Sequence, residues 1–368
     1  MKTILGSRKH HYLMKLSVFL ITAALIAAMA GCTYNPPSKN LEIRTWYDLD
    51  KVRDNLPGSH ALMNDLDSTT PGYEELASPT ANGGKGWLPI GAIWELAFGG
   101  TFDGQGYEIR DLFINRHDEN YVGLFGVLSG GEIKDIGLVN ATVTGNESAG
   151  GLVGRNNYAD LRDCHFAGNV NSEGLYVGGL AGYNFFGVVG DSSSTGNVTG
   201  YRNVGGLVGC NYEGALYGSY STCSVSGDKY VGGLVGRNHQ GDVAVSSARG
   251  NVVGNGVVGG LVGDNYNGGV TKCYAAGSVV SAGFAGGLIG ANFQYGWVSD
   301  SFWDVETSGQ ATSDGGTGKN TTEMQDIAIF SGAGWNITAV ANSSTRDPAY
   351  IWNVVNNVTY PFLSWQPV

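Results

Sequence analysis

The sequence has few charged residues, and its basic residues do not follow the pattern of a nucleic-acid-binding module. Charged side chains make up 14% of the 368 residues, and the formal net charge is −11. A nucleic-acid groove needs clustered Lys and Arg, so we expect no nucleic-acid partner. The stretch Gly104-Gln105-Gly106 lacks the rest of a dinucleotide fingerprint, so we expect no nucleotide either.

Cysteine and histidine are also scarce, with five and six residues respectively. The sequence contains no Cys-x-x-Cys pair, no Cys/His spacing typical of a metal site and no His-Glu-x-x-His. No Ser/His/Asp order and no phosphate loop stand out. Cys210 and Cys223 lie in one repeat, and they would form a disulfide only if a corner of the fold brought them together. The sequence therefore predicts no catalytic residue, no enzyme activity and no firm metal site.

The first 31 residues have the pattern of an export signal. Four basic residues precede an apolar run from Leu16 to Ala28, which is too short to span a membrane comfortably. The sequence Met-Ala-Gly-Cys that ends at Cys32 resembles the lipobox of bacterial lipoproteins. This implies a lipid on Cys32 that anchors the chain to the cell envelope, at the outer membrane or cell surface. An ordinary signal peptide cut after Gly31 is the alternative, Met14 is an alternative start, and residues 32–40 are a predicted tether.

A short sequence, Gly-Gly-Leu-Val-Gly-x-Asn, recurs along the middle of the chain. Its leucines, with one degenerate first copy, are 27 or 28 residues apart. They are Leu124, Leu152, Leu180, Leu207, Leu234, Leu261 and Leu288. The 60 glycines follow no Gly-X-Y order, which excludes collagen. A regular period of this length predicts a stacked-repeat architecture.

Each repeat contains three apolar anchors about nine residues apart. With the repeat Leu as position 0, position +9 is apolar in every copy, and position +18 is Val in five of them. β-branched anchors, frequent glycine and short segments favour strands. We therefore predict an all-β fold, a right-handed parallel β-helix of about seven three-sided coils over residues 101–305. Leu and the adjacent Val cannot both point inward from a flat strand, so either the Gly pair bends the chain or Val forms an outer stripe.

The open ends of such a solenoid need caps, because they expose apolar core and unpaired strand edges. Residues 41–100 are the predicted N-terminal cap, with a helix from Trp46 to Leu56 that Thr45 caps. A separate binding domain is the alternative. Residues 306–368 are the predicted C-terminal loop and cap. Its expected core is Trp335, Trp352, Tyr360, Phe362 and Trp365.

An asparagine follows the repeat Leu by four residues in six copies. We predict that these side chains form a hydrogen-bonded amide ladder, as stacked asparagines do in cross-β assemblies. A polar binding row is the alternative. The residues are Asn156, Asn184, Asn211, Asn238, Asn265 and Asn292.

Position +5 is the leading candidate for a binding face. It is mostly aromatic, and aromatic rows on a rigid face suit sugar rings or a partner protein. Aromatic stacking that only stabilises the coils is the alternative. The candidate residues are Phe185, Tyr212, His239, Tyr266 and Phe293.

Position +11 is a weaker candidate, because it carries Asp135, Asp163 and Asp191 in three successive repeats. Stacked carboxylates could bind Ca²⁺ or act as an acid/base pair, which keeps a polysaccharide lyase or hydrolase as an alternative function. The plainer interpretation is that Asp bonds backbone N–H groups at a corner. Apart from weak Ca²⁺ binding, we expect no cofactor.

The recurring Gly-Gly-Leu-Val-Gly sequences resemble the GLUG repeats of bacterial surface proteins and adhesins. The resemblance covers roughly residues 41–368, and it implies a β-helix without a defined activity. Some such arrays lie beside the metallopeptidase domain of IgA-cleaving proteases, but the metal motif of that domain is absent from this chain. We therefore predict a monomeric, lipid-anchored surface protein whose solenoid binds a glycan or a protein, with a purely structural envelope component as a further alternative.

Overall fold

The structure is a computed structural model that describes residues 40–367. The predicted export signal, Cys32 and residues 32–39 of the predicted tether lie outside this part of the chain. No helix within the described part is long and apolar enough to cross a membrane.

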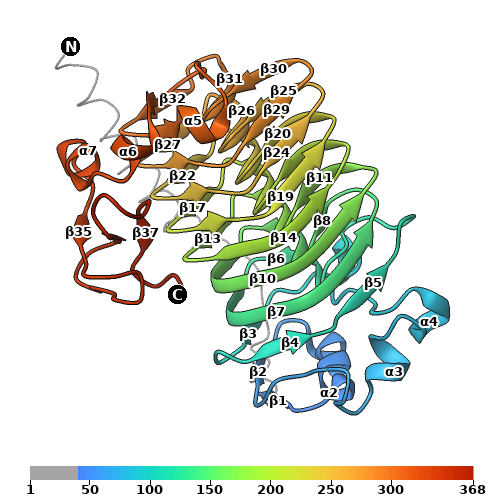
Figure 1. Cartoon of the computed structure of the whole chain (residues 1–368). Helices are drawn as coiled ribbons and strands as arrows, with labels where there is room; N and C mark the ends of the chain where they lie inside the picture. The colour runs from blue at the N-terminus through green and yellow to red at the C-terminus, as the bar shows by residue number, and fades with distance from the viewer. Residues whose placement is uncertain (1–39, 368) are drawn as a thin grey trace, which may run out of the picture. The chain divides into compact units, whose positions relative to one another are not determined.

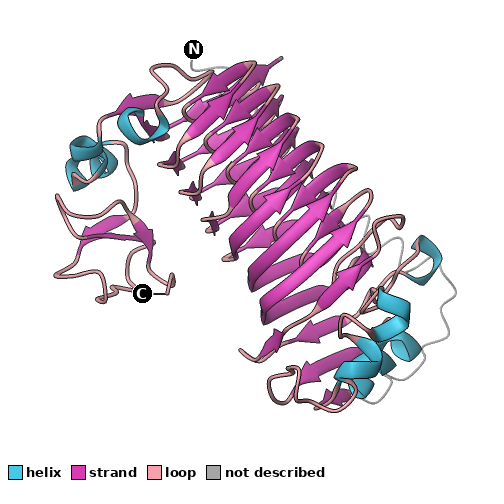
Figure 2. Cartoon of the chain, turned by 45° about the vertical axis from the view of Figure 1, so that its right-hand side comes forward, coloured by secondary structure: helices cyan, strands magenta, loops and turns pink. Residues whose placement is uncertain are grey.

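The described chain winds into a parallel β-solenoid of about eight turns, which is built from three sheets (Figures 1 and 2). Sheet A has 21 strands, sheet B has seven and sheet C has six. Equivalent residues of successive coils pair in register, so that Asn184 lies between Asn156 and Asn211. The predicted parallel β-helix is therefore confirmed.

Each coil passes through sheet C, then sheet B, then sheet A. The strands of sheet C are β8 (Ala149–Gly150), β11 (Leu175–Gly178), β15 (Arg202–Gly205), β20 (Lys229–Gly232), β25 (Val257–Gly259) and β30 (Phe284–Gly286). The strands of sheet B are β6 (Phe125–Ser129), β9 (Val153–Asn157), β12 (Ala181–Phe185), β16 (Val208–Tyr212), β21 (Val235–His239), β26 (Val262–Tyr266) and β31 (Ile289–Phe293).

Sheet A forms the widest side, with up to three short strands in one coil. Its first strands are β1 (Leu41–Ile43), β2 (Ser59–Leu62), β3 (Thr101–Asp103), β4 (Glu108–Arg110), β5 (Phe113–Asn115), β7 (Glu132–Gly145) and β10 (Asp160–Ser172). The middle strands are β13 (Val188–Gly190), β14 (Ser193–Thr199), β17 (Ala215–Tyr217), β18 (Tyr220–Ser221), β19 (Ser224–Gly227), β22 (Asp242–Ala244), β23 (Ser247–Ala248) and β24 (Val252–Gly254). The last are β27 (Gly269–Thr271), β28 (Tyr274–Ala275), β29 (Val279–Ser281), β32 (Trp297–Ser299), β33 (Phe302–Asp304) and β34 (Thr317–Lys319).

The Gly pair before each repeat Leu bends the chain between sheets C and B. Leu207 and Val208 are both fully buried, although they are adjacent in sequence. A Cβ atom on Gly205 would lie 2.0 Å from the carbonyl oxygen of Val208, so only glycine permits this fold-back. Of the two arrangements left open by the sequence, the bend is therefore the correct one.

Left-handed residues stack in three columns and bend the coil. They occupy positions −4, +6 and +11, and they include many residues other than glycine. The +11 equivalents, with φ between 47° and 60°, are Asp135, Asp163, Asp191, Gly218, Val245, Lys272 and Asp300. Asp adopts this conformation more readily than β-branched or bulky residues do. The Asp column therefore has a conformational reason to exist that needs no ligand.

The N-terminal segment continues the solenoid instead of forming a domain of its own. Strands β1 and β2 pair in parallel with each other, and β2 pairs with β3. Helix α2 (Trp46–Asp50) begins at Thr45, whose hydroxyl accepts a hydrogen bond from the Asp48 N–H, and it passes into η1 (Lys51–Asn55). The remaining short helices are α3 (Tyr73–Leu76), α4 (Ala81–Gly84) and η2 (Trp94–Leu96). The buried side chains of this segment, Trp87 among them, join the core of the repeats.

The C-terminal segment adds one strand to sheet A and then folds back over the outer face of that sheet (Figures 1 and 2). It contains α5 (Val305–Ser308), α6 (Thr321–Met324), α7 (Ile327–Gly332) and a small sheet of β35 (Ile337–Ala339), β36 (Trp352–Val354) and β37 (Phe362–Leu363). Its core includes Trp335 and Trp352, and it packs on Tyr274 of sheet A. Trp365, predicted to lie in this core, is instead 37% exposed.

Candidate functional site

The six asparagines at position +4 form a continuous column of hydrogen bonds. The Nδ2 of each of the first five donates to the Oδ1 of the next asparagine over 2.8–2.9 Å. Each also donates to a nearby carbonyl oxygen of its own coil over 2.9–3.1 Å. Because these amides satisfy one another, the column has little to offer a ligand, and its geometry fits a structural role.

The aromatic residues at position +5 stack on one another along the solenoid. The ring centroids of Tyr212 and His239 are 4.6 Å apart with the planes 7° from parallel, and those of His239 and Tyr266 are 4.8 Å apart at 10°. Phe185 stacks on Tyr212 at 5.4 Å. Stacked rings cover each other's faces, so the middle of the column offers ring edges to solvent. Only Phe293, at the end of the column, is strongly exposed, at 49%.

Sheets B and C meet along a seam where their backbones approach closely. A Cβ on Gly209 of sheet B would lie 2.4 Å from the backbone nitrogen of Val177 in sheet C. Outward side chains of the two sheets therefore contact each other, and the rings of Tyr176 and Tyr183 are 4.7 Å apart. We call this surface the B–C seam. Its residues are Arg155, Tyr176, Tyr183, Arg202, Asn203, Lys229, Tyr230, Arg237 and Asp264.

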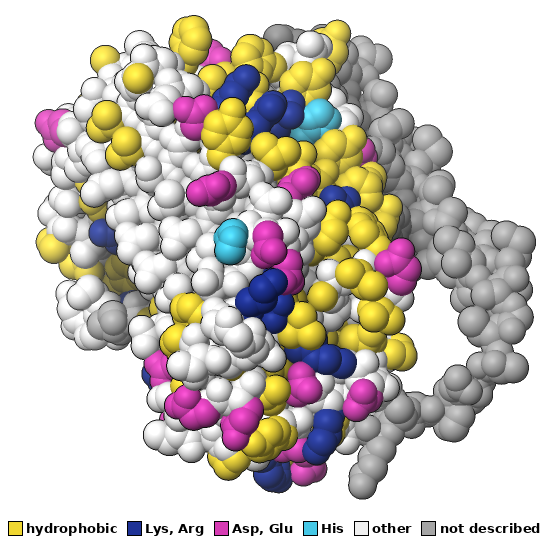
Figure 3. Space-filling view, turned by 90° about the vertical axis from the view of Figure 1, so that its right-hand side faces the viewer, with side chains coloured by type: hydrophobic (Ala, Val, Ile, Leu, Met, Phe, Trp, Pro, Cys, Tyr) yellow, Lys and Arg dark blue, Asp and Glu magenta, His cyan; other side chains and the backbone are white. Residues whose placement is uncertain are grey.

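Basic side chains lie over the rings of the seam. The Arg155 guanidinium is 4.4 Å from the ring centroid of Tyr183. Three cations surround Tyr230, with Lys229, Arg202 and Arg237 at 5.1, 5.2 and 5.6 Å from its centroid. Figure 3 shows a band of hydrophobic side chains, with basic ones among them, beside a wide area of uncharged surface. Such cation–π contacts orient the guanidinium groups.

One buried ion pair lies in the seam. The Arg237 Nε is 2.9 Å from Asp264 Oδ2, and Asp264 is 1% exposed. Burial raises the pKa of the Asp264 carboxyl, and the charge of Arg237 opposes that rise. Removing Arg237 would leave a buried carboxylate without its main partner, so we regard Arg237 as part of the framework.

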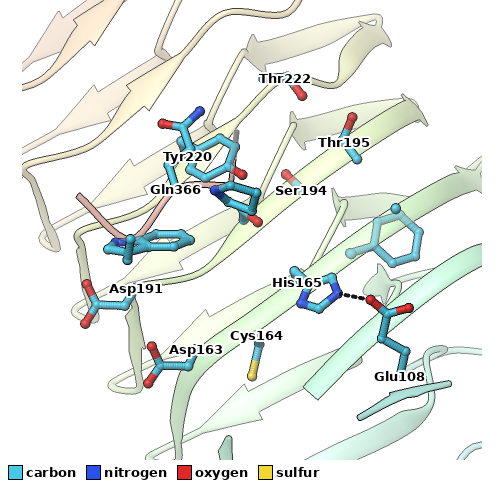
Figure 4. Close-up of a pocket in the computed structure, with 15 residues that line it drawn as sticks. Glu108, Asp163, Cys164, His165, Asp191, Ser194, Thr195, Tyr220, Thr222 and Gln366 are labelled. Carbon is cyan, nitrogen blue, oxygen red and sulfur yellow. Dashed lines mark hydrogen bonds and ion pairs between the residues drawn. The ribbon is translucent and has the colours of Figure 1, made fainter. Parts of the chain in front are cut away.

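A groove with a volume of about 540 Å³ lies between the outer face of sheet A and the end of the C-terminal segment (Figure 4). Its floor carries hydroxyl, carboxyl and imidazole groups from neighbouring coils. Its wall is the segment from Trp365 to Pro367. The lining residues are Glu108, Asp163, Cys164, His165, Phe166, Ala167, Asp191, Ser193, Ser194, Thr195, Tyr220, Thr222, Trp365, Gln366 and Pro367.

The groove has an aromatic side and a charged side. The rings of Trp365 and Tyr220 are 5.5 Å apart and tilted by 37°. In Figure 4, His165 turns toward Glu108, and its Nε2 is 3.3 Å from Glu108 Oε1. The wall is held in place by Arg346, whose Nε and Nη2 donate to the carbonyl oxygen of Gln366 over 3.0 and 2.9 Å.

Two of the three predicted aspartates, Asp163 and Asp191, line this groove, and Asp135 does not. Burial raises the pKa of Asp163, and the charge of Asp135 adds to the rise. Burial likewise raises the pKa of Asp191, with a further contribution from Asp163. Within residues 40–367, no three His, Cys, Asp or Glu side chains come together as a group that could hold a metal ion. The aspartate column therefore gains no support as a Ca²⁺ site.

The cysteine thiols of the described chain are not accessible to solvent. Cys164, Cys210, Cys223 and Cys273 are free and buried, so Cys210 and Cys223 form no disulfide. Burial raises the pKa of the Cys210 and Cys273 thiols to about 12 and that of Cys223 to about 11. Thiols with such pKa values stay protonated at neutral pH and are poor nucleophiles.

Sequence reasoning missed the groove because Trp365 and Tyr220 are 145 positions apart and only the fold-back of the C-terminal segment joins them. It also missed the basic side chains of the seam. A signal for the seam was present at position +3, which carries Arg155, Tyr183, Arg237 and Asp264.

The GLUG motif family matches two consecutive repeats of the solenoid, residues 145–171 and 173–199. The chain therefore carries GLUG repeats in this part of the solenoid. It is 38% identical over 148 residues to a protein of Evansella cellulosilytica provisionally named a Gly-rich membrane protein, which covers 39% of this chain and 16% of that protein. It is 42% identical over 74 residues to halomucin of Haloquadratum walsbyi, which covers 20% of this chain and 1% of halomucin. This GLUG-repeat chain thus matches only a small part of these relatives' length.

Among solved structures, the GLUG-repeat chain is similar to a Bacteroides ovatus protein provisionally named an immunoglobulin A1 protease. The TM-score is 0.56 at 17% identity, and the match covers 91% of this chain and 94% of that chain. At this identity the likeness shows the shared β-helix fold and leaves the activity of this chain open.

Proposed function

We propose that this GLUG-repeat chain is a cell-envelope protein that binds a carbohydrate in the groove on sheet A. Export and lipid anchoring through Cys32 are part of this proposal, and they rest on the sequence pattern of residues 1–32. A relative is named as a membrane protein, which agrees with envelope association.

The observation that carries the proposal is the pairing of Trp365 with Tyr220 over a floor of hydroxyl groups. Sugar rings have apolar C–H faces and polar hydroxyl edges, so they suit a pocket with an aromatic side and hydrogen-bonding groups opposite it. Ser193, Thr195 and Thr222 supply such groups from two neighbouring coils. The stacked +5 column supports a glycan less well, because its ring faces are already covered.

The groove favours an uncharged sugar. Glu108, Asp163 and Asp191 place three carboxyl groups on its lining, and His165 is the only Lys, Arg or His side chain there. Carboxylates accept hydrogen bonds from sugar hydroxyls and repel anionic groups. We therefore expect neutral hexose polymers to bind in preference to uronate or sulfated polymers at this site.

Binding of the full chain to neutral glycans, followed by calorimetry or on a glycan array, tests the proposal. Trp365→Ala should weaken binding about tenfold or more, because one side of the groove is lost. Trp297→Ala is the matched control, because Trp297 is 44% exposed and does not line the groove. Equal affinities of the Trp365→Ala variant and the unaltered chain would contradict the proposal, as would a failure of all neutral glycans to bind.

Hydrolysis of the bound glycan is a second candidate function, which the adjacent aspartates favour. Asp163 and Asp191 follow strand residues that pair directly across neighbouring coils, and both have a raised pKa. One protonated and one ionised carboxyl are the groups that glycoside hydrolysis requires. Release of new reducing ends, lost in both Asp163→Asn and Asp191→Asn while binding persists, would establish this function. Binding without turnover leaves the non-enzymatic proposal.

A peptidase function has less support. The similar Bacteroides ovatus chain carries a protease name, but that likeness extends only to fold. The described cysteines are buried thiols with raised pKa values, and the sequence lacks His-Glu-x-x-His.

A further inference from the structure

The B–C seam gathers basic side chains in a chain that is acidic as a whole. Four of them lie in the seam, on the coils of Leu152, Leu207 and Leu234, and the whole chain has 21 Lys and Arg against 32 Asp and Glu. The four are Arg155, Arg202, Lys229 and Arg237. The groove on sheet A has the opposite charge, because it is lined by three carboxyl groups and no Lys or Arg.

Acidic groups near the seam offset part of its positive charge. Asp264 is buried and pairs with Arg237. The charge of Glu147 raises the pKa of Tyr176, and the charge of Glu213 acts electrostatically on His239. Four basic groups against three acidic groups leave a surplus of one positive charge.

Four side chains of the seam carry a buried polar atom without a hydrogen-bond partner: Arg202, Asn203, Asp264 and Arg237, whose Nε nonetheless forms the ion pair with Asp264 Oδ2. The Oδ1 of Asn203 has no hydrogen-bond partner, and Asn203 is 3% exposed. The Nε of Arg202, next in sequence, is likewise buried without a partner. Buried polar atoms without a partner are costly in a folded protein, and a bound ligand is one means of satisfying them.

The basic groups are spread along the solenoid axis. Arg155 and Arg237 occupy equivalent positions on β9 and β21, which are separated by β12 and β16. Three strand spacings of about 4.8 Å place the two arginines about 14 Å apart. Aromatic rings lie between and beside them, with Tyr183 under Arg155 and Tyr230 under Arg237.

We propose that the B–C seam binds an acidic polysaccharide that runs along the solenoid axis, with sugar carboxylates on Arg202, Lys229 and Arg155. Guanidinium groups recognise carboxylates by paired hydrogen bonds, and the rings beside them suit sugar faces. A linear polymer fits better than a compact anion because the cations form a row. This site is separate from the groove, so it takes a different class of glycan.

Polygalacturonate and its carboxyl-reduced form are the probes, and the full chain is used. The unaltered chain should bind polygalacturonate, bind the reduced polymer at least tenfold more weakly, and lose affinity between 50 and 200 mM salt, because paired charges supply the affinity. Dextran sulfate is a third probe, which tests whether sulfate groups bind as well as carboxylates do. Sulfate binding as tight as carboxylate binding would overturn the assignment to carboxylates.

The double variant Arg202→Gln and Lys229→Gln should bind polygalacturonate about tenfold more weakly. Arg237 is left in place to keep Asp264 paired. The matched control is Arg44→Gln with Lys51→Gln, which removes the same charge from exposed ion pairs with Glu42 and Asp48. Unfolding temperature checks that both variants fold. Unchanged binding in the seam variant, an equal loss in the control, or no preference for the acidic polymer would each overturn the proposal. Trp365→Ala should leave this binding intact, so the groove and the seam are tested separately.

Discussion

The interior columns of the solenoid repeat almost without change, whereas each outward column changes from coil to coil. Leu at position 0 and Asn at +4 recur through six coils and are buried in nearly all of them. At the outward position +13, by contrast, His165, Ser193 and Tyr220 follow one another. Parallel stacking imposes this difference, because an inward side chain must fit its counterparts on both neighbouring coils, while an outward side chain is free to vary.

Both proposed binding sites lie on the outside of the coil. The groove and the seam are both built from outward residues, and they differ in charge although the same repeat carries them. A stacked scaffold therefore separates stability from recognition. Substitutions on the inside and on the outside of the coil should therefore differ in their effect on stability.

The largest effect is expected when an inward asparagine is compared with an outward one. Asn211→Ala removes the acceptor of Asn184 and the donor to Asn238. Each buried group left without a partner costs about 1–3 kcal/mol of unfolding free energy. Asn197→Ala breaks an exposed bond to Asn169 and should cost less than about 0.5 kcal/mol. Chemical denaturation measures both, and equal losses would remove the distinction between inside and outside.

A smaller effect is expected at the glycines. Gly205→Ala places a Cβ 2.0 Å from the Val208 carbonyl oxygen, so the backbone must shift, at a cost of about 1–3 kcal/mol. Gly332→Ala meets no atom within 4 Å and should be neutral or slightly stabilising. The midpoints of thermal unfolding report the difference. An unchanged midpoint for Gly205→Ala would show that the bend is not under steric control.

The smallest effect concerns the outward aspartates and depends on pH. The folded pKa of Asp191 is raised above its unfolded value, so its contribution to stability is full at low pH and is lost as pH rises through the folded pKa. Asp191→Asn should therefore be more stable than the unaltered chain at neutral pH, by less than about 1 kcal/mol, and the gain should vanish below the unfolded pKa. Asparagine also tolerates the left-handed backbone there.

Asp67 should show the opposite dependence of stability on pH. Hydrogen bonds from Thr69 lower the pKa of Asp67, so its stabilising contribution is present at neutral pH and is lost as pH falls through the folded pKa. Asp67→Asn should be less stable at neutral pH and equal to the unaltered chain in acid. Denaturant unfolding at several pH values measures both variants. For each variant, the difference in unfolding free energy from the unaltered chain is followed against pH. If the two differences changed with pH in the same direction, burial at Asp191 and hydrogen bonding at Asp67 could not both be the causes.

Much of the fold could be predicted because the period repeats the same physical constraint in each coil. The alternation of anchors and the regular spacing of Leu leave few arrangements that bury every apolar column. The extent of the first coils was harder to predict, since β1 and β2 have no repeat motif and yet pair in register with the later strands. Their place depends on backbone hydrogen bonds, which any sequence supplies.

The candidate binding face was predicted less well. The +5 residues are aromatic and outward, as expected, but Tyr212, His239 and Tyr266 cover each other's faces. Ring orientation depends on the rotamers of neighbouring coils, and a column of residue types does not specify those rotamers.

The sequence by itself determined the repeat, the strands and the buried Leu and Asn columns, because each follows from a local pattern copied along the chain. Only the tertiary structure decided which outward residues meet. Trp365 reaches Tyr220 because the C-terminal segment folds back onto sheet A, and Arg202 approaches Tyr230 because their strands are neighbours in sheet C. Such contacts join residues far apart in the chain, and their geometry is set by the packing of whole elements.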